Sequence, residues 1–155
     1  MFANIALKEC DPKKAIIDIL FAPSKIYTIL WAVKLDVLEH LYTKPMTAEA
    51  LADVIATKPE LTSRLLRALV TLGFLVKNEQ QQFEVTELGS ALRTGSDNSI
   101  KHILQFFFEH GRIANTSIVN TSKTGEHAFI STYGMDFFDY ITENCELRNI
   151  FHIGL

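Results

Sequence analysis

The segment from Leu35 to Arg93 constrains the fold more than any other part of the chain. It reads LDVLEHLYTKPMTAEALADVIATKPELTSRLLRALVTLGFLVKNEQQQFEVTELGSALR. Its apolar residues first recur every three or four positions, as in helices that bury one face, and later alternate, as in a strand. The segment therefore predicts three helices, two short strands and the start of another helix, in that order.

Local signals set the limits of these helices. After the break at Pro45, Thr47 can cap a short helix over 48–55, and an acid in its first turn is favoured by the helix dipole. Thr57 then begins a capping-box spacing, and Gly73 suits the residue just past the end of a helix that closes at Leu72. On this second helix, one set of residues is expected to face inward: Leu61, Leu65, Leu66, Leu69 and Leu72.

A β-hairpin is predicted at about 74–85. An apolar run at 74–76 and a polar turn at 78–81 precede a returning strand on which Phe83 and Val85 alternate. Three helices followed by such a hairpin have the order of a winged helix. The predicted fold class is therefore mostly α, winged-helix-like, with one small hairpin.

Helices are also expected on both sides of this centre. Asp11 followed by proline is a good helix start, and after Pro23 a second helix should run to about Tyr42. Tyr27 and Trp31 extend its apolar surface beyond one stripe, so this helix should pack on two sides. Beyond the hairpin, we expect a helix capped by Thr86 with Leu88 and Leu92 inward, a long helix at 98–120, and shorter helices at 126–132 and 135–144 on either side of Gly134.

Composition and charge exclude several classes of function. The chain has 155 residues with a formal charge of −3, and the surplus of acids lies in residues 96–155, with seven acids against four bases. No segment has the basic excess that phosphate neutralisation requires, so no nucleic acid is expected as partner. No uninterrupted apolar run approaches the ~20 residues of a membrane span. Cys10 and Cys145 form no CxxC pair, and we expect a cytoplasmic protein with no membrane partner.

No motif of catalysis or metal binding is found in the sequence. The glycines do not form the GxGxxG turn that lets the backbone approach a nucleotide, and no GxxxxGK[ST] or GxSxG motif is present. No histidine sits in HExxH or at ligand spacing, and the glutamate before His110 would point away from it on a helix. We therefore predict no catalytic, cofactor-binding or metal-binding residue, the five histidines being His40, His102, His110, His127 and His152.

The winged-helix order by itself suggests DNA binding. The second helix would offer Arg64 and Arg67 to the major groove. Glu60 shares their face, however, and the wing carries Lys77 beside two glutamates, so phosphate attraction would be weak. The alternative is that the two arginines pair with neighbouring acids on a solvated face.

Several fragments together resemble one enzyme family from about Phe21 to the last residue. Their order and spacing are those of the N-terminal dimerisation domain of SAM-dependent small-molecule O-methyltransferases, of the plant caffeate, acetylserotonin and bacterial polyketide types. The fragments are AVKLDVLEHL, PMTAEALA, RLLRALVTLGFL, FEVTELGSALR, SKTGEHAFISTYGMDFFDYI and ELRNIFHIGL.

The resemblance implies a division of labour along the chain. Residues 1–155 would be a single dimerisation domain, with dimer helices at 1–43, a winged helix at 44–95 and a helical substrate-capping segment at 96–155. The family's SAM-binding Rossmann domain is absent from this stretch, so we expect no cofactor to be bound by the chain itself. By position, the resemblance assigns Phe21, Ile26, Leu30 and Trp31 to a dimer interface, and Phe106, Phe107 and Phe137 to substrate capping; core packing is the alternative for each.

The function implied is dimerisation and substrate capping in an enzyme that methylates a small aromatic or polyketide-like hydroxyl. The chain would form a homodimer, meet a small-molecule substrate only together with a catalytic domain, and be inactive alone, which leaves open whether it counts as an enzyme. Two alternatives remain: a winged-helix DNA-binding transcriptional regulator, and a truncated product or regulatory paralogue that modulates a full-length methyltransferase.

Overall fold

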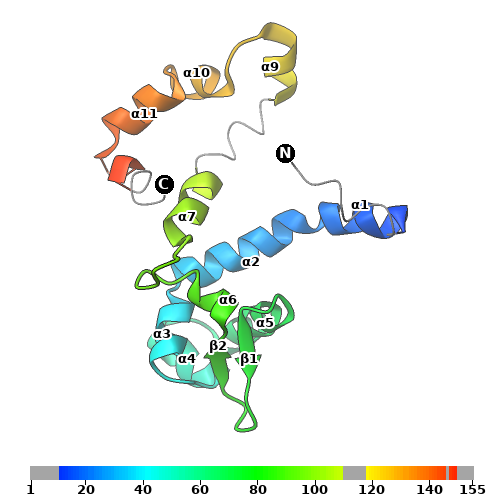
Figure 1. Ribbon diagram of the computed structural model, residues 1–155, viewed down its shortest axis with the longest axis vertical. Helices are drawn as coiled ribbons and strands as arrows, with labels where there is room; N and C mark the ends of the chain where they lie inside the picture. Colours follow the sequence, from blue (N-terminus) through cyan, green and yellow to red (C-terminus); the bar gives the residue numbers. More distant parts are fainter. Residues whose placement is uncertain (1–10, 110–117, 146, 150–155) are drawn as a thin grey trace. The chain divides into compact units, whose positions relative to one another are not determined.

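The computed structural model describes residues 11–109, 118–145 and 147–149. The chain forms two compact units, Met1–Glu84 and Val85–Leu155. The described part is mostly helical, and its one sheet is a two-stranded hairpin (Figure 1). The predicted fold class, mostly α with a winged-helix order and one small hairpin, is confirmed.

Two helices that follow each other with one intervening residue open the first unit. α1 (Pro12–Leu20) starts where predicted, because the Asp11 carboxylate accepts a hydrogen bond from the Lys13 amide at 3.1 Å. α2 (Ala22–Lys34) follows directly after Phe21. Pro23 lies in the first turn of α2, where its missing N–H is not needed.

The helix predicted to run to Tyr42 is interrupted at Asp36. α2 ends at Lys34, Asp36 has a left-handed backbone conformation with φ of 49°, and α3 (Val37–Thr43) begins after it. Aspartate adopts this conformation more readily than most residues. Apolar residues keep helical spacing on both sides of the break, so the sequence pattern alone could not reveal it.

The predicted cap of the next helix is confirmed. α4 (Ala48–Val54) begins after Thr47, whose hydroxyl accepts a hydrogen bond from the Ala50 amide at 3.3 Å. Glu49 lies in the first turn of α4, as expected. This helix packs against α5 (Pro59–Thr71).

The capping box predicted at the start of α5 does not form. α5 begins at Pro59, Lys58 is its N-cap, and no side chain caps it. With Thr57 as N-cap, the proline would occupy the second helical position, and it lacks one of the two N–H groups that a capping hydroxyl uses. The Thr57 hydroxyl instead lies 2.7 Å from that of Thr62, which also contacts the Lys58 carbonyl at 3.1 Å.

Gly73 has the role predicted for it, the residue just past the end of α5. Gly73 has φ of 83°, which suits a residue without a Cβ. Its N–H donates to the Val70 carbonyl at 3.0 Å, and the Phe74 N–H donates to the Leu69 carbonyl at 2.9 Å. These two hydrogen bonds form a Schellman motif, which satisfies carbonyls that the helix itself leaves free.

The face that α5 buries differs from the predicted one at its N-terminal end. Thr62, Leu66 and Leu69 are buried, whereas Leu61, expected to face inward, is 57% exposed. A threonine can take the inward position because its hydroxyl is satisfied by Thr57 and Lys58. The core of the first unit is completed by further apolar residues of α2 to α4 and the hairpin, chiefly Leu30, Val33, Val37, Leu38, Leu41, Leu51, Leu75 and Phe83.

The hairpin consists of β1 (Leu75–Lys77) and β2 (Phe83–Val85). Its turn is closed by the Asn78 side chain, which accepts a hydrogen bond from the Gln82 amide at 2.9 Å. Phe83 also donates its N–H to the Met46 carbonyl at 2.8 Å, in an isolated bridge. The predicted hairpin is therefore confirmed.

The second unit opens with the short helix α6 (Glu87–Ser90). Thr86 caps it as predicted, because its hydroxyl accepts a hydrogen bond from the Gly89 amide at 3.1 Å. Leu92 is buried as expected, but Leu88 is exposed, and its predicted inward position is wrong. α6 ends after a single turn, so the two leucines do not share one continuous helix face.

Four further helices are described in the second unit. The helix predicted at 98–120 starts later, at Lys101, as α7 (Lys101–Glu109); residues 110–117 lie outside the described ranges. The helices predicted at 126–132 and 135–144 are found within two residues of their expected bounds. They are α10 (Ala128–Tyr133) and α11 (Phe137–Glu143), preceded by α9 (Ile118–Thr124).

Candidate functional site

The apolar side chains of α1 face solvent. This helix contains no buried residue, and Ile16 and Leu20 are 67% and 69% exposed. On α2, Trp31 is also exposed, with 61% of its area accessible. Large exposed apolar areas on a folded chain mark interaction sites. We call this the N-terminal apolar surface, formed by Ile16, Ile19, Leu20, Phe21 and Trp31.

The same region is long and apolar enough to cross a membrane, by length and composition alone. Within Pro12–Lys34, taken as one helix, an 18-residue window reaches a mean hydropathy of 1.6, and only 17% of that window is buried. Asp18, Pro23 and Lys25 interrupt it. A lipid phase and a protein partner both cover apolar side chains, so the composition identifies an uncovered surface without naming what covers it.

The four residues predicted for a dimer interface differ in their exposure to solvent. Phe21 and Trp31 are exposed, and Ile26 is partly so. Leu30 is 6% exposed, because its side chain belongs to the core of the first unit. Three residues therefore remain available to a partner, and the interface itself stays a prediction. The sequence pattern had shown an apolar α1 but not that its isoleucines and Leu20 would all remain uncovered.

Aromatic rings pack together in the second unit. The Phe137 ring makes edge contacts with Phe106 and Phe129, at centroid distances of 5.8 and 5.2 Å. The Tyr133 and Tyr140 rings lie 4.4 Å apart at a tilt of 31°. Edge and tilted arrangements of this kind stabilise aromatic cores beyond their area burial. We call this group the C-terminal aromatic cluster; Ile141 and Leu147 complete its apolar packing.

Two of the residues predicted for substrate capping lie in this cluster. Phe106 is buried, so most of its ring is already covered by the chain itself. Phe137 is half-buried, and the neighbouring Phe138, which the sequence analysis did not single out, is largely exposed. The side chain of Phe107 lies outside the described part of the structure. The capping role stays a prediction.

Titratable groups form no metal-binding cluster in the ranges that the structure describes. Among these residues, no three His, Cys, Asp or Glu side chains are grouped to hold a metal ion. His110, His152 and Cys10 lie outside the described residues. The pKa of Glu49 is lowered by a hydrogen bond from its own backbone and by the Thr47 hydroxyl, as expected at the start of α4.

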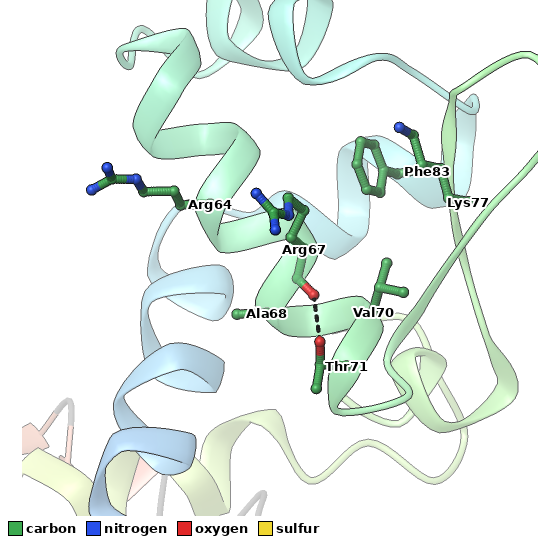
Figure 2. A pocket seen from close by; sticks show the side chains of 7 residues that line it. All are labelled: Arg64, Arg67, Ala68, Val70, Thr71, Lys77 and Phe83. Atoms are coloured by element: carbon green, nitrogen blue, oxygen red, sulfur yellow. Dashed lines mark hydrogen bonds between the residues drawn. The ribbon is translucent and has the colours of Figure 1, made fainter.

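A shallow depression of about 530 Å³ lies between α5 and the hairpin (Figure 2). Its cationic groups come from Arg64 and Arg67 on α5 and from Lys77 on β1. Apolar atoms between them are contributed by Ala68, Val70 and Phe83. Neither arginine forms the ion pair that the sequence left as an alternative, as far as the described residues show. We call this the basic depression.

Comparisons with known proteins identify the family of the chain. Residues 17–95 match the family described as the O-methyltransferase dimerisation domain. The chain is 31% identical over 140 residues to O-demethylpuromycin-O-methyltransferase of Streptomyces alboniger. This match covers 84% of the present chain. It spans only 37% of the length of that relative.

Solved structures share the fold over nearly the whole chain. The crystal structure of LaPhzM covers 94% of this chain and 44% of its own, with a TM-score of 0.83 and 23% identity. CalO1 is a methyltransferase of calicheamicin biosynthesis, solved with SAH bound. Its structure matches 94% of this chain and 45% of its own, with a TM-score of 0.74 and 19% identity. At these identities the likeness shows the fold alone. The match over residues 17–95 goes further, and it shows that the chain belongs to the O-methyltransferase dimerisation domain family.

Proposed function

We propose that the chain forms a homodimer through the N-terminal apolar surface. The observation that carries this proposal is α1, a nine-residue helix with a proper N-terminal cap and no buried residue. A helix gains most of its stability by packing its apolar face, so this one requires a partner surface. Membership of a dimerisation family supports a second copy of the chain as that partner.

We further propose that the dimer serves a SAM-dependent O-methyltransferase acting on a small aromatic or polyketide-like hydroxyl. The name of the puromycin relative supports this reaction class, and the chain spans 37% of that protein. The share of this chain would be to position the acceptor and exclude water. The exposed Phe138 beside Phe137 offers an aromatic surface for such capping.

The described residues do not fit a SAM site, so no step of methyl transfer is assigned to them. Nucleotide-type cofactors bind where a parallel strand leads through a glycine-rich turn into a helix. In the ranges that the structure describes, the strands form only the hairpin β1–β2. We therefore propose that this chain alone neither binds SAM nor transfers methyl groups, and calorimetric titration with SAM tests this directly.

No observation favours the DNA-binding alternative. The basic depression contributes three cations, whereas DNA-binding proteins commonly neutralise six to ten phosphates or thereabouts. The idea of a regulatory paralogue is tested by co-purification with a full-length methyltransferase. Relatives named as small-molecule methyltransferases support a cytoplasmic location, which we propose for this chain as well.

Sedimentation velocity tests the dimer. We expect the wild-type chain to sediment as a dimer at micromolar concentration, and a Leu20→Glu, Trp31→Glu double variant to sediment as a monomer. Leu61→Glu with Val76→Glu is the matched control, since it places the same two charges on other exposed apolar residues of the first unit. A wild-type monomer, or a double variant that remains dimeric, would overturn the proposal.

A further inference from the structure

The residues that line the basic depression carry three positive charges and no negative charge. Arg64 and Arg67 lie one turn apart on α5; in Figure 2 Arg64 points away from Lys77 and Phe83, and Arg67 lies between Arg64 and these hairpin residues. Neither guanidinium forms an ion pair within the ranges described. Like charges at this spacing destabilise a helix slightly. A chain with a formal charge of −3 thus gathers three cations at one place, two of them without an ion pair in the described ranges.

Carboxylates nearby do not line the depression. Glu49 interacts electrostatically with Lys77, and Glu60 precedes Arg64 by one turn of α5, but the lining itself contains no acid. The Lys77 ammonium lies 5.5 Å from the centre of the Phe83 ring. The result is a strip of cations beside a small apolar area, lying open to solvent.

We propose that the basic depression docks an acidic helical segment of a partner protein. Side chains three or four positions apart on a helix lie next to each other, roughly 5–6 Å between Cβ atoms. Two carboxylates one turn apart on a ligand helix therefore match Arg64 and Arg67, whose planar guanidinium groups suit carboxylates. An apolar side chain between those carboxylates would contact Ala68 and Val70.

A protein segment fits the depression better than the other anionic ligands. Small-molecule sites enclose most of their ligand, whereas this depression is open. Nucleic acid would require a wider basic surface, and Glu60 on α5 would repel the phosphates that flank any contact with Arg64. An acidic protein helix can place its few charges where the cations are and present neutral residues elsewhere.

This docking surface is distinct from the one proposed for dimerisation. The N-terminal apolar surface lies on α1 and α2, whereas the basic depression is built from α5 and the hairpin. Loss of one function therefore need not affect the other. Sedimentation separates them, because variants of the depression should remain dimeric.

Fluorescence anisotropy with a defined probe tests the proposal. The probe is a labelled peptide of alanine, leucine and glutamate, about 20 residues long so that it is helical in water, with glutamates one turn apart beside a leucine. We expect saturable binding to the full chain at low salt. Arg64→Glu with Arg67→Glu should weaken binding at least about tenfold, and roughly 0.5 M salt should abolish it.

Matched variants and ligands make the outcome decisive. Lys44→Glu with Lys123→Glu changes the net charge equally at exposed positions elsewhere and should bind the peptide like wild type. Arg64→Gln with Arg67→Gln should also weaken binding, and circular dichroism checks that each variant is folded. Any one of three results overturns the proposal. These are no saturable binding of the peptide at low salt, an equal loss of affinity in the lysine control, or tighter binding of random duplex DNA than of the peptide.

Discussion

The centre of the first unit and its N-terminal helices use similar apolar residues with opposite outcomes. In α4 and α5, Leu51 and Leu66 are fully buried, whereas Leu20 of α1 is largely exposed. Both regions contain a helix with a side-chain N-cap, Asp11 for α1 and Thr47 for α4, so capping does not distinguish them. The difference is one of packing: the centre buries its leucines within the chain, whereas nothing among the described residues buries those of α1.

The largest effect is expected from a cavity in the centre of the first unit, which tests whether its buried leucines stabilise the fold. Leu66→Ala removes a fully buried side chain from the face of α5, and we expect the free energy of unfolding to fall by roughly 2–5 kcal/mol. Denaturant unfolding at one fixed protein concentration measures it. Leu61→Ala on the same helix is exposed and should change stability by less than about 0.5 kcal/mol. Equal losses would mean that the burial pattern of α5 is wrong.

A second prediction concerns the uncovered helices. Trp31→Ala should weaken dimerisation by about 2 kcal/mol, or roughly thirtyfold in the dissociation constant, because buried tryptophans dominate many interfaces. Sedimentation across a dilution series measures this constant. Val76→Ala, an exposed apolar residue of β1, is the control and should leave the constant unchanged. A tryptophan variant that dimerises like wild type would place the interface elsewhere.

A smaller effect is expected from the caps. Thr47→Ala removes the hydroxyl that accepts from the Ala50 amide, and the free energy of unfolding should fall by about 1 kcal/mol. Thr47→Ser keeps that acceptor and should retain most of the stability. Thermal unfolding of the two variants measures the difference. If serine fails to rescue, the threonine methyl group rather than the cap accounts for the loss.

The smallest effect concerns acid sensitivity. The pKa of Glu49 is lowered in the folded chain, so its ionised form adds stability above the usual value of 4.5, and this contribution is lost as the pH falls through the folded pKa. Glu49→Gln should therefore flatten the acid side of the stability curve slightly. Glu79→Gln, in the hairpin turn, is the control. Unfolding measured at several values below pH 5 compares the variants.

Local chemistry allowed much of the fold to be predicted. Asp11, Thr47 and Thr86 cap helices as expected, and Gly73 ends α5, because each acts through hydrogen bonds within a few residues. The break at Asp36 could not be predicted, since the apolar period continues across it. The buried position of Thr62 depended on a hydroxyl partner that only the folded chain provides.

The candidate sites were less accessible to sequence reasoning. Residue type indicated that α2 carries too many apolar side chains for one stripe, but not that Leu30 is buried while Trp31 is exposed. The basic depression depends on Lys77 of the hairpin lying beside α5. The sequence analysis named Arg64, Arg67 and Lys77 as cations of one winged helix, but only the folded chain shows that they line one depression.

The order of elements along the chain has a consequence during synthesis. α1 and α2 leave the ribosome before α5, against which α2 packs. At about 5–20 residues per second, the roughly 40 intervening residues take about 2 to 8 seconds to appear. Throughout that interval the face of α2 that packs against α5 is uncovered, in addition to the isoleucines of α1, and both can meet chaperones or an identical nascent neighbour on the same messenger. Expression yield should therefore respond to translation speed more strongly than the stability of the finished protein would suggest.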